Sequence, residues 1–180
     1  MGRLKPLSPD RLTPAQKKIV EARPDGQPRG PSSVWFRTPE TLALVAPLME
    51  HLRTRTSLEP RLLELMMLVP LRAWTAQFGW LAHEKLGLQA GLDKAAVDAI
   101  KHRRTPVFAR EDEGALYALA SEIVEKKKVS DATYARAVAA VGETTVVDAV
   151  SVVGFYMMVA GVLSTFQVDV QHGATPALAD

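Results

Sequence analysis

The sequence predicts an all-α protein, and three features of its pattern support this fold class. Apolar residues recur at three- and four-residue spacing through most of the 180-residue chain, as on the buried face of a helix. Capping residues, prolines and glycines stand where these stretches begin and end. No convincing alternation of apolar and polar residues, the mark of a half-buried strand, appears between them. We therefore expect about seven or eight helices in a bundle, preceded by an N-terminal arm.

The arm is expected over residues 1–37, and a single helical domain over residues 38–180. Within the arm, Thr13 and Pro14 can cap and begin a short helix that reaches about Ala22. The sequence RPDGQPRGPSS that follows is typical of turns and loops.

Two proline-started helices are expected at the beginning of the domain. Thr38 and Pro39 supply an N-cap and a first helical residue, and Pro47 should kink or divide the helix that follows. Pro60 begins the next helix, RLLELMMLV, which Pro70 should end or bend. The apolar stripe of the first helix comprises Leu42, Val45, Leu48, Met49 and Leu52.

Capping and breaking residues also delimit the later helices. The sequence LRAWTAQFGWLAHEKLG, directly after Pro70, is expected to be helical, and its last glycine lies near the end of the helix. Asp93 and Ser130 can cap further helices, and Gly142 can end one. These helices are expected at about residues 93–102, 111–127, 130–142 and 143–166, of which the last is the most apolar.

The last helix raises the question of a membrane span, because no charged residue occurs from Ala149 to Val168. Asp148 and Asp169 flank this stretch, and no lysine or arginine lies nearby to anchor it. Small and polar residues dilute it, including Ser151, Gly154, Gly161, Ser164, Thr165 and Gln167. A core or subunit-contact helix is therefore expected rather than the alternative, a transmembrane helix.

Charge and cysteine content exclude several classes of function. The formal net charge is +2, whereas a nucleic-acid partner usually requires a concentrated basic face. The two basic runs, residues 101–104 and 126–128, are interpreted as helix ends. The chain has no cysteine, which excludes disulfides, thiolate metal sites and thiol nucleophiles. No apolar signal sequence occurs in residues 1–30, so the cytoplasm is the expected compartment.

His83 is the first candidate functional residue. On a helix it shares a face with Ala76, Gly79 and Trp80, and Gly79 costs about 1 kcal/mol relative to alanine in a helix interior. This face can be a groove that a ligand uses, or Gly79 can simply admit a neighbouring helix while His83 packs in the core. Another helical face, expected to be core, carries Trp74, Phe78 and Leu81.

Glu64 is the best candidate for a partner of His83. It lies in the apolar sequence RLLELMMLV, where a carboxylate is costly unless it is paired or protonated. A functional histidine in turn needs a partner that sets its tautomer or charge. The alternative is that Glu64 faces solvent or pairs with Arg61.

These residues belong to a recognisable pattern. The sequence LLELMMLVPLRAWTAQFGWLAHEKLG, residues 62–87, resembles the core motif of the carboxymuconolactone decarboxylase and alkylhydroperoxidase-D-like superfamily. RLLEL is similar to its glutamate-bearing helix, and GWLAHEKLG to its E-W-x-x-H helix followed by glycine. Residues 115–166 resemble the later part of the family pattern, in the same order.

The resemblance implies an alkylhydroperoxidase-D-like helical bundle in which Glu64 and His83 share a pocket. It also implies a homotrimer, or a hexamer built from trimers. The positions of the two family cysteines are Ala76 and Gly79 here, so the dithiol peroxidase cycle of that branch is excluded. The missing sulfur atoms are expected to leave room for a ligand beside His83.

The function that the resemblance implies is that of a decarboxylase without a cofactor, acting on a small carbonyl or lactone acid. His83 would protonate the carbanion, and Glu64 would orient or recharge the imidazole. No metal is expected, since one histidine and one glutamate are too few ligands. The alternatives are another acid–base enzyme, such as an isomerase or hydrolase, and a non-catalytic assembly protein.

Further residues are candidates for the substrate pocket. Arg72 and Arg61, which are nearby in the sequence, can hold a remote carboxylate of the substrate. Trp80 and Tyr156 can wall an apolar cavity, although core packing is the simpler interpretation of Tyr156. The expected partners are therefore a small molecule and other copies of this chain, with neither nucleic acid nor membrane.

Overall fold

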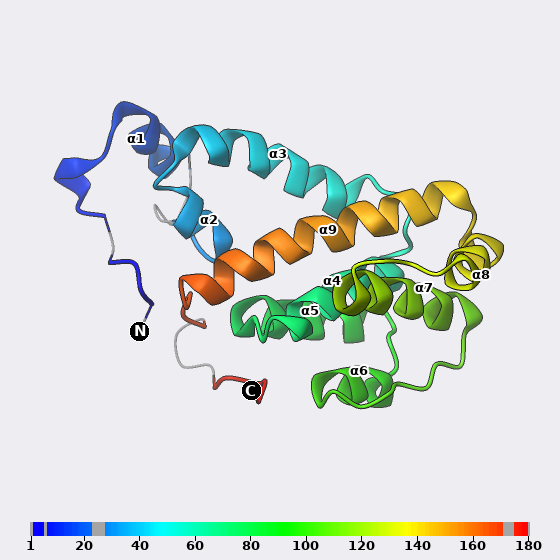
Figure 1. The fold of residues 1–180 in the computed structure, drawn as a ribbon. Helices are drawn as coiled ribbons and strands as arrows, with labels where there is room; N and C mark the ends of the chain where they lie inside the picture. The colour runs from blue at the N-terminus through cyan, green and yellow to red at the C-terminus, as the bar shows by residue number, and fades with distance from the viewer. Residues whose placement is uncertain (1, 6, 23–27, 171–174, 180) are drawn as a thin grey trace.

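The structure is a computed structural model that describes all residues except 1, 6, 23–27, 171–174 and 180 (Figure 1). Within the described residues it has nine α-helices, eight of them with seven or more residues, and no strand, which confirms the all-α prediction. In chain order the α-helices are α1 (Pro14–Glu21), α2 (Pro31–Trp35), α3 (Pro39–Thr54), α4 (Pro60–Ala73), α5 (Gln77–Gln89), α6 (Lys94–Lys101), α7 (Glu111–Ser121), α8 (Asp131–Val141) and α9 (Glu143–Thr165). Two short elements complete the order, a 3₁₀ turn at Pro9–Arg11 and a π-helical turn at Glu122–Lys126.

Local capping signals place several helix starts where the sequence predicts them. Thr13 and Gln16 form a capping box at α1, in which each side chain satisfies the other's backbone N–H. Asp93 accepts a hydrogen bond from the backbone N–H of Ala96 at the start of α6. Ser130 does the same for Thr133 at the start of α8.

Helix α4 is the centre of the core. Its side chains at Leu65, Met66, Leu68 and Leu71 are completely buried, because α5, α7 and α9 pack around it. Figure 1 shows α9 running the length of the molecule, with α3 along one side and α4, α5 and α7 along the other. An apolar helix such as α4 is stable in this setting because neighbours cover all its faces.

Helix α9 is long and apolar enough to cross a membrane when length and composition alone are considered. Half of its most apolar window is buried inside the fold. Val152 and Val153, on its inner face, are fully buried, and α3, α4, α5 and α7 contact the helix. Packing in the core is therefore sufficient to explain the apolar character of this face.

Two prolines that were expected to kink, bend or interrupt helices lie inside continuous helices. Helix α3 continues through Pro47 to Thr54, so of the two expected outcomes, a kink or a division, the division does not occur. Helix α4 includes Pro70 and ends three residues later, at Ala73. A proline removes one helical hydrogen bond, but buried apolar side chains on both sides of each proline hold the helix in place.

The expected continuous helix after Pro70 is divided by a turn at Trp74–Ala76. Thr75 has a positive φ of 50°, which is uncommon for a residue other than glycine. Its hydroxyl accepts hydrogen bonds from Arg72 at 3.1 Å and Arg103 at 3.2 Å. Trp74 is the first residue of this turn and is 46% exposed, so the prediction that it belongs to the core is wrong.

The predicted arm is joined to the core in the structure. Trp35 and Phe36 are buried, and the Gln16 side chain donates a 2.8 Å hydrogen bond to the backbone carbonyl of Phe36. Residues on both sides of position 38 contribute to one core cluster. The domain boundary at residue 38 stays a prediction.

Candidate active site

Glu64 and His83 are in direct contact where α4 and α5 pack against each other. The Nδ1 atom of His83 lies 2.7 Å from Oε2 of Glu64, although the two residues are 19 positions apart in the chain. The His83 side chain is 5% exposed and that of Glu64 is 13% exposed. The contact predicted from the sequence is therefore present, and Glu64 is the more accessible partner.

Two further side chains extend this contact into a chain of hydrogen bonds. The hydroxyl of Tyr156, on α9, lies 3.2 Å from Nε2 of His83. Arg53, in the last turn of α3, donates from Nε to the same hydroxyl at 2.9 Å. Glu64, His83, Tyr156 and Arg53 thus form a continuous series drawn from four helices, which we call the relay.

Tyr156 holds its position in the relay as a neutral phenol. The residue is 1% exposed, and its ring packs edge-on against the His83 ring with centroids 5.1 Å apart. Burial raises the pKa of the Tyr156 hydroxyl above its usual value. The hydroxyl therefore keeps its proton at neutral pH and can donate a hydrogen bond.

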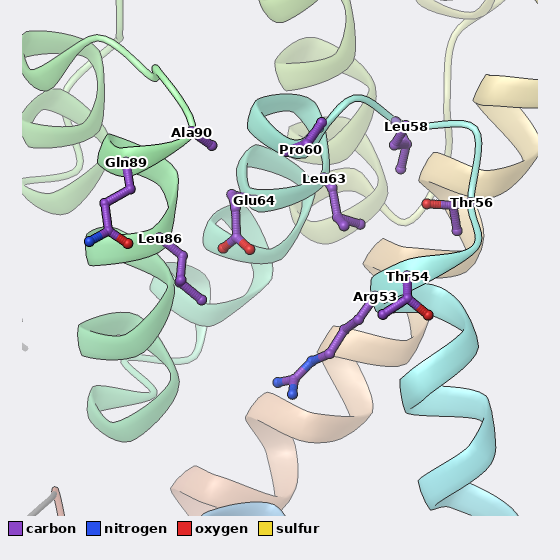
Figure 2. A pocket seen from close by; sticks show the side chains of 10 residues that line it. All are labelled: Arg53, Thr54, Thr56, Leu58, Pro60, Leu63, Glu64, Leu86, Gln89 and Ala90. Atoms are coloured by element: carbon purple, nitrogen blue, oxygen red, sulfur yellow. The ribbon is translucent and has the colours of Figure 1, made fainter.

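A pocket of about 430 Å³ opens beside the relay, between the end of α3, the start of α4 and the end of α5 (Figure 2). Glu64 and Arg53 are among its lining residues, whereas His83 and Tyr156 are not. The pocket therefore meets the two ends of the relay, and the middle of the relay is buried behind it. The other lining residues are Thr54, Thr56, Leu58, Pro60, Leu63, Leu86, Gln89 and Ala90.

Two charged groups at the pocket are available to a ligand. Within the described part of the chain, the terminal nitrogens of Arg53 and the Oε1 atom of Glu64 have no hydrogen-bond partner. Figure 2 shows the Arg53 guanidinium extending from α3 towards the side of the pocket where the Glu64 carboxylate lies. A guanidinium and a carboxylate at one pocket suit a small molecule that carries both an anionic group and a proton to exchange.

None of the five residues expected to form the substrate pocket lines this pocket. Ala76, Gly79 and Trp80 are buried in the core and do not line this pocket. Arg72 is also buried, and it donates to the backbone carbonyls of Lys101 and Ala179. Tyr156, the fifth, contacts His83 instead of the pocket.

The expected ligand space at Gly79 is filled by protein. A Cβ atom built on Gly79 would lie 2.4 Å from Cδ2 of Leu71 and 3.3 Å from Cδ1 of Leu163. Both leucines are buried. The expectation that the missing sulfur atoms leave room for a ligand is therefore wrong at Gly79, because Leu71 packs into that space.

We expect Gly79→Ala to lower the free energy of unfolding. The added methyl group would overpack the core at a cost of about 1–3 kcal/mol, and the better helix propensity of alanine offsets at most about 1 kcal/mol of it. Gly161→Ala is the matched control, because its Cβ would meet Trp74 at an ordinary 3.8 Å. Urea denaturation of both variants measures the difference. A Gly79→Ala variant as stable as Gly161→Ala would contradict the packing described here.

Arg61 forms hydrogen bonds with a cluster of carboxylates and does not pair with Glu64. It donates to Glu113 at 2.8 Å, to Asp112 at 2.5 Å and to Glu59 at 3.2 Å. Burial alone would raise the pKa of Asp112, but hydrogen bonds from Arg61 and Arg110 outweigh this and lower it to about 2. Asp112 is therefore ionised at neutral pH, and the hydrogen bonds of Arg61 tie the first turn of α4 to α7.

Sequence reasoning missed Arg53, which completes the relay. Its only local signal is a position in the last turn of a helix, where a cation is favourable for reasons unrelated to a site. Among the residues that the structure describes, no three histidine or acidic side chains are grouped as metal ligands. The site must be interpreted from its own geometry, since the sequence matches no protein-family model and no curated protein.

Proposed function

We propose that this protein is an acid–base enzyme that needs no cofactor and acts on a small carbonyl or lactone acid, with decarboxylation as the reaction. The observation that carries the proposal is the pocket that meets both ends of the relay, Glu64 and Arg53. A buried histidine behind an accessible carboxylate is an arrangement suited to proton transfer. The resemblance to the carboxymuconolactone decarboxylase superfamily supports the choice of reaction.

The geometry favours a different division of roles from the one suggested by the sequence. Glu64 lines the pocket and is the group that exchanges a proton with the substrate. His83 lies behind it and sets the hydrogen bonding of the carboxylate. Arg53 takes the part proposed for Arg72, because its terminal nitrogens have no partner among the described residues and can bind a substrate carboxylate in a bidentate manner.

The decarboxylation proceeds through an enolate. The bond to the departing carboxylate breaks, carbon dioxide leaves, and the electron pair passes to the neighbouring carbonyl. The carbonyl then re-forms while the carbon takes a proton from the Glu64 carboxyl group. Glu64 is left as a carboxylate that accepts the His83 hydrogen bond and regains a proton from solvent, so one proton is consumed for each carbon dioxide released.

The proposal is tested by incubating the purified protein with a panel of unsaturated lactone acids and β-keto acids, and by measuring carbon dioxide release. Turnover above buffer without added metal or cofactor supports it. Proton exchange or double-bond migration without carbon dioxide release would indicate an isomerase. The complete absence of both activities would refute the proposal and favour a non-catalytic assembly protein.

We expect Arg53→Met to raise KM for a substrate found in this panel by about 10- to 100-fold, which corresponds to the loss of charged hydrogen bonds. Arg55→Met is the matched control, because Arg55 is exposed near the same helix end but does not line the pocket. Steady-state kinetics of both variants measure the effect. An unchanged KM in Arg53→Met would remove Arg53 from the binding role.

We also propose that the protein is a homotrimer or a hexamer of trimers. Val147, Val150 and Met158, on the outer face of α9, are 65%, 43% and 42% exposed, and contiguous exposed apolar surface is a common sign of a protein partner. Multi-angle light scattering at micromolar concentration is expected to give three or six times the mass of the 19.6 kDa chain. A stable monomer would refute this expectation.

A further inference from the structure

The relay has a fixed donor direction at one end. A guanidinium can only donate hydrogen bonds, so the bond from Arg53 Nε uses an acceptor position of the Tyr156 oxygen. The buried hydroxyl, whose pKa is raised by burial, keeps its own proton. Leaving that proton without an acceptor would cost about 1–3 kcal/mol.

Among the residues that the structure describes, the remaining partner of the Tyr156 hydroxyl is His83. The Nε2 atom of His83 lies 3.2 Å from this hydroxyl. Nε2 can accept a hydrogen bond from the hydroxyl only when Nε2 itself is not protonated. The imidazole proton then resides on Nδ1, which lies 2.7 Å from the Glu64 carboxylate. Every donor in the series therefore points from Arg53 towards Glu64.

We infer that Tyr156 is a positioning residue that fixes the protonated nitrogen of His83 and so leaves Glu64 Oε1 free for proton transfer. This inference rests on the proposed function. With Nδ1–H held against Oε2, the proton that Glu64 exchanges with a substrate is carried by Oε1. Without the Tyr156 donor, the imidazole proton can move to Nε2, and a proton on Glu64 can then lie on Oε2, where it points at His83 and away from the substrate.

The inference is tested by ¹⁵N NMR of protein labelled at its four histidines, with the His83 signal identified by its loss in His83→Gln. The wild type should show the Nδ1–H tautomer near neutral pH. Tyr156→Phe should show a mixture that includes Nε2–H. Tyr117→Phe is the matched control, because it removes the same atom from a partly buried tyrosine that lies outside the relay.

Arg53→Met provides a second route to the same result. It leaves Tyr156 in place but removes the donor that forces the hydroxyl to point at His83, and Arg53 is exposed, so the fold should tolerate the change. The same tautomer mixture is expected. A wild type with Nε2–H, or an unchanged Nδ1–H signal in folded Tyr156→Phe and Arg53→Met, would overturn the inference.

A kinetic measurement separates this inference from the proposed function. With a substrate from the panel, Tyr156→Phe should lower kcat by about 10- to 100-fold, the scale known for partners that orient metal-binding histidines, and leave KM unchanged because Tyr156 does not line the pocket. Undiminished kcat would refute the positioning role while the proposed function stands. If no compound is turned over, the proposed function fails and the positioning role fails with it, whatever the tautomer of His83.

Discussion

Glu64→Gln should lower turnover by about 10²- to 10⁴-fold, the usual range for a positioned acid or base. Glutamine preserves the size of the side chain at the pocket but cannot carry the proton that Glu64 exchanges. The measurement is kcat on a substrate from the panel, with the variant shown to have the native oligomer size and melting temperature. Glu84→Gln is the matched control, because Glu84 lies on neighbouring α5, pairs with Lys101 at 3.0 Å and does not line the pocket.

The same measurement on His83→Gln tests whether the pair acts as a unit. The single variants should be impaired in the same step, and the double variant should be little worse than the worse single one. Wild-type turnover in a well-folded Glu64→Gln variant would eliminate Glu64 as the proton-transfer group. Wild-type turnover in folded His83→Gln would return His83 to a packing role.

Arg61→Met should lower the free energy of unfolding by about 3–5 kcal/mol, because removing one member of a buried ion pair leaves its partner charged and unpaired. Arg61 is 7% exposed and Glu113 is 4% exposed, so solvent cannot replace the lost hydrogen bonds. Methionine retains most of the side-chain volume of arginine, so the decrease in the free energy of unfolding measures the effect of removing the charge. Denaturant unfolding at neutral pH measures it.

Arg136→Met is the control for the effect of Arg61→Met. Its pair with Glu111 also involves α7, but the two side chains are 48% and 69% exposed, and exposed pairs are worth about 0–1 kcal/mol. Adding Glu113→Gln to Arg61→Met should relieve part of the loss, because it removes the unpaired charge. If Arg61→Met lowered the free energy of unfolding by less than about 1 kcal/mol, the cluster would contribute no more to stability than an exposed ion pair does.

The stability of this cluster also bears on the candidate site. Arg61 ties the first turn of α4 to α7, and Glu64 lies one turn further along the same helix. The relay needs Glu64 at 2.7 Å from His83, a distance that depends on how α4 sits against α5. Arg61 thus supports the site through the position of a helix, whereas the sequence had suggested a direct contact with substrate.

Elements whose signals are local could be predicted from the sequence. The caps at Thr13, Asp93 and Ser130 involve residues three positions apart, so the sequence contains the whole interaction. The all-α class follows from the same short-range periodicity. The apolar neighbours of Glu64 indicate that its carboxylate needs a partner, but they leave solvent and Arg61 as alternatives, and the resemblance to the superfamily is what favoured the pair with His83.

The surroundings of that pair depend on how the helices pack in three dimensions. Arg53 and Tyr156 are 103 residues apart in the chain, and no local pattern indicates that α3 and α9 bring them into contact with each other next to His83. Leu71 fills the space at Gly79, which depends on the angle at which α4 meets α5. Such contacts arise from the packing of whole helices, in which many weak interactions select one arrangement. For that reason the sequence identified two of the chemical groups, and the fold determined which of them meets the pocket.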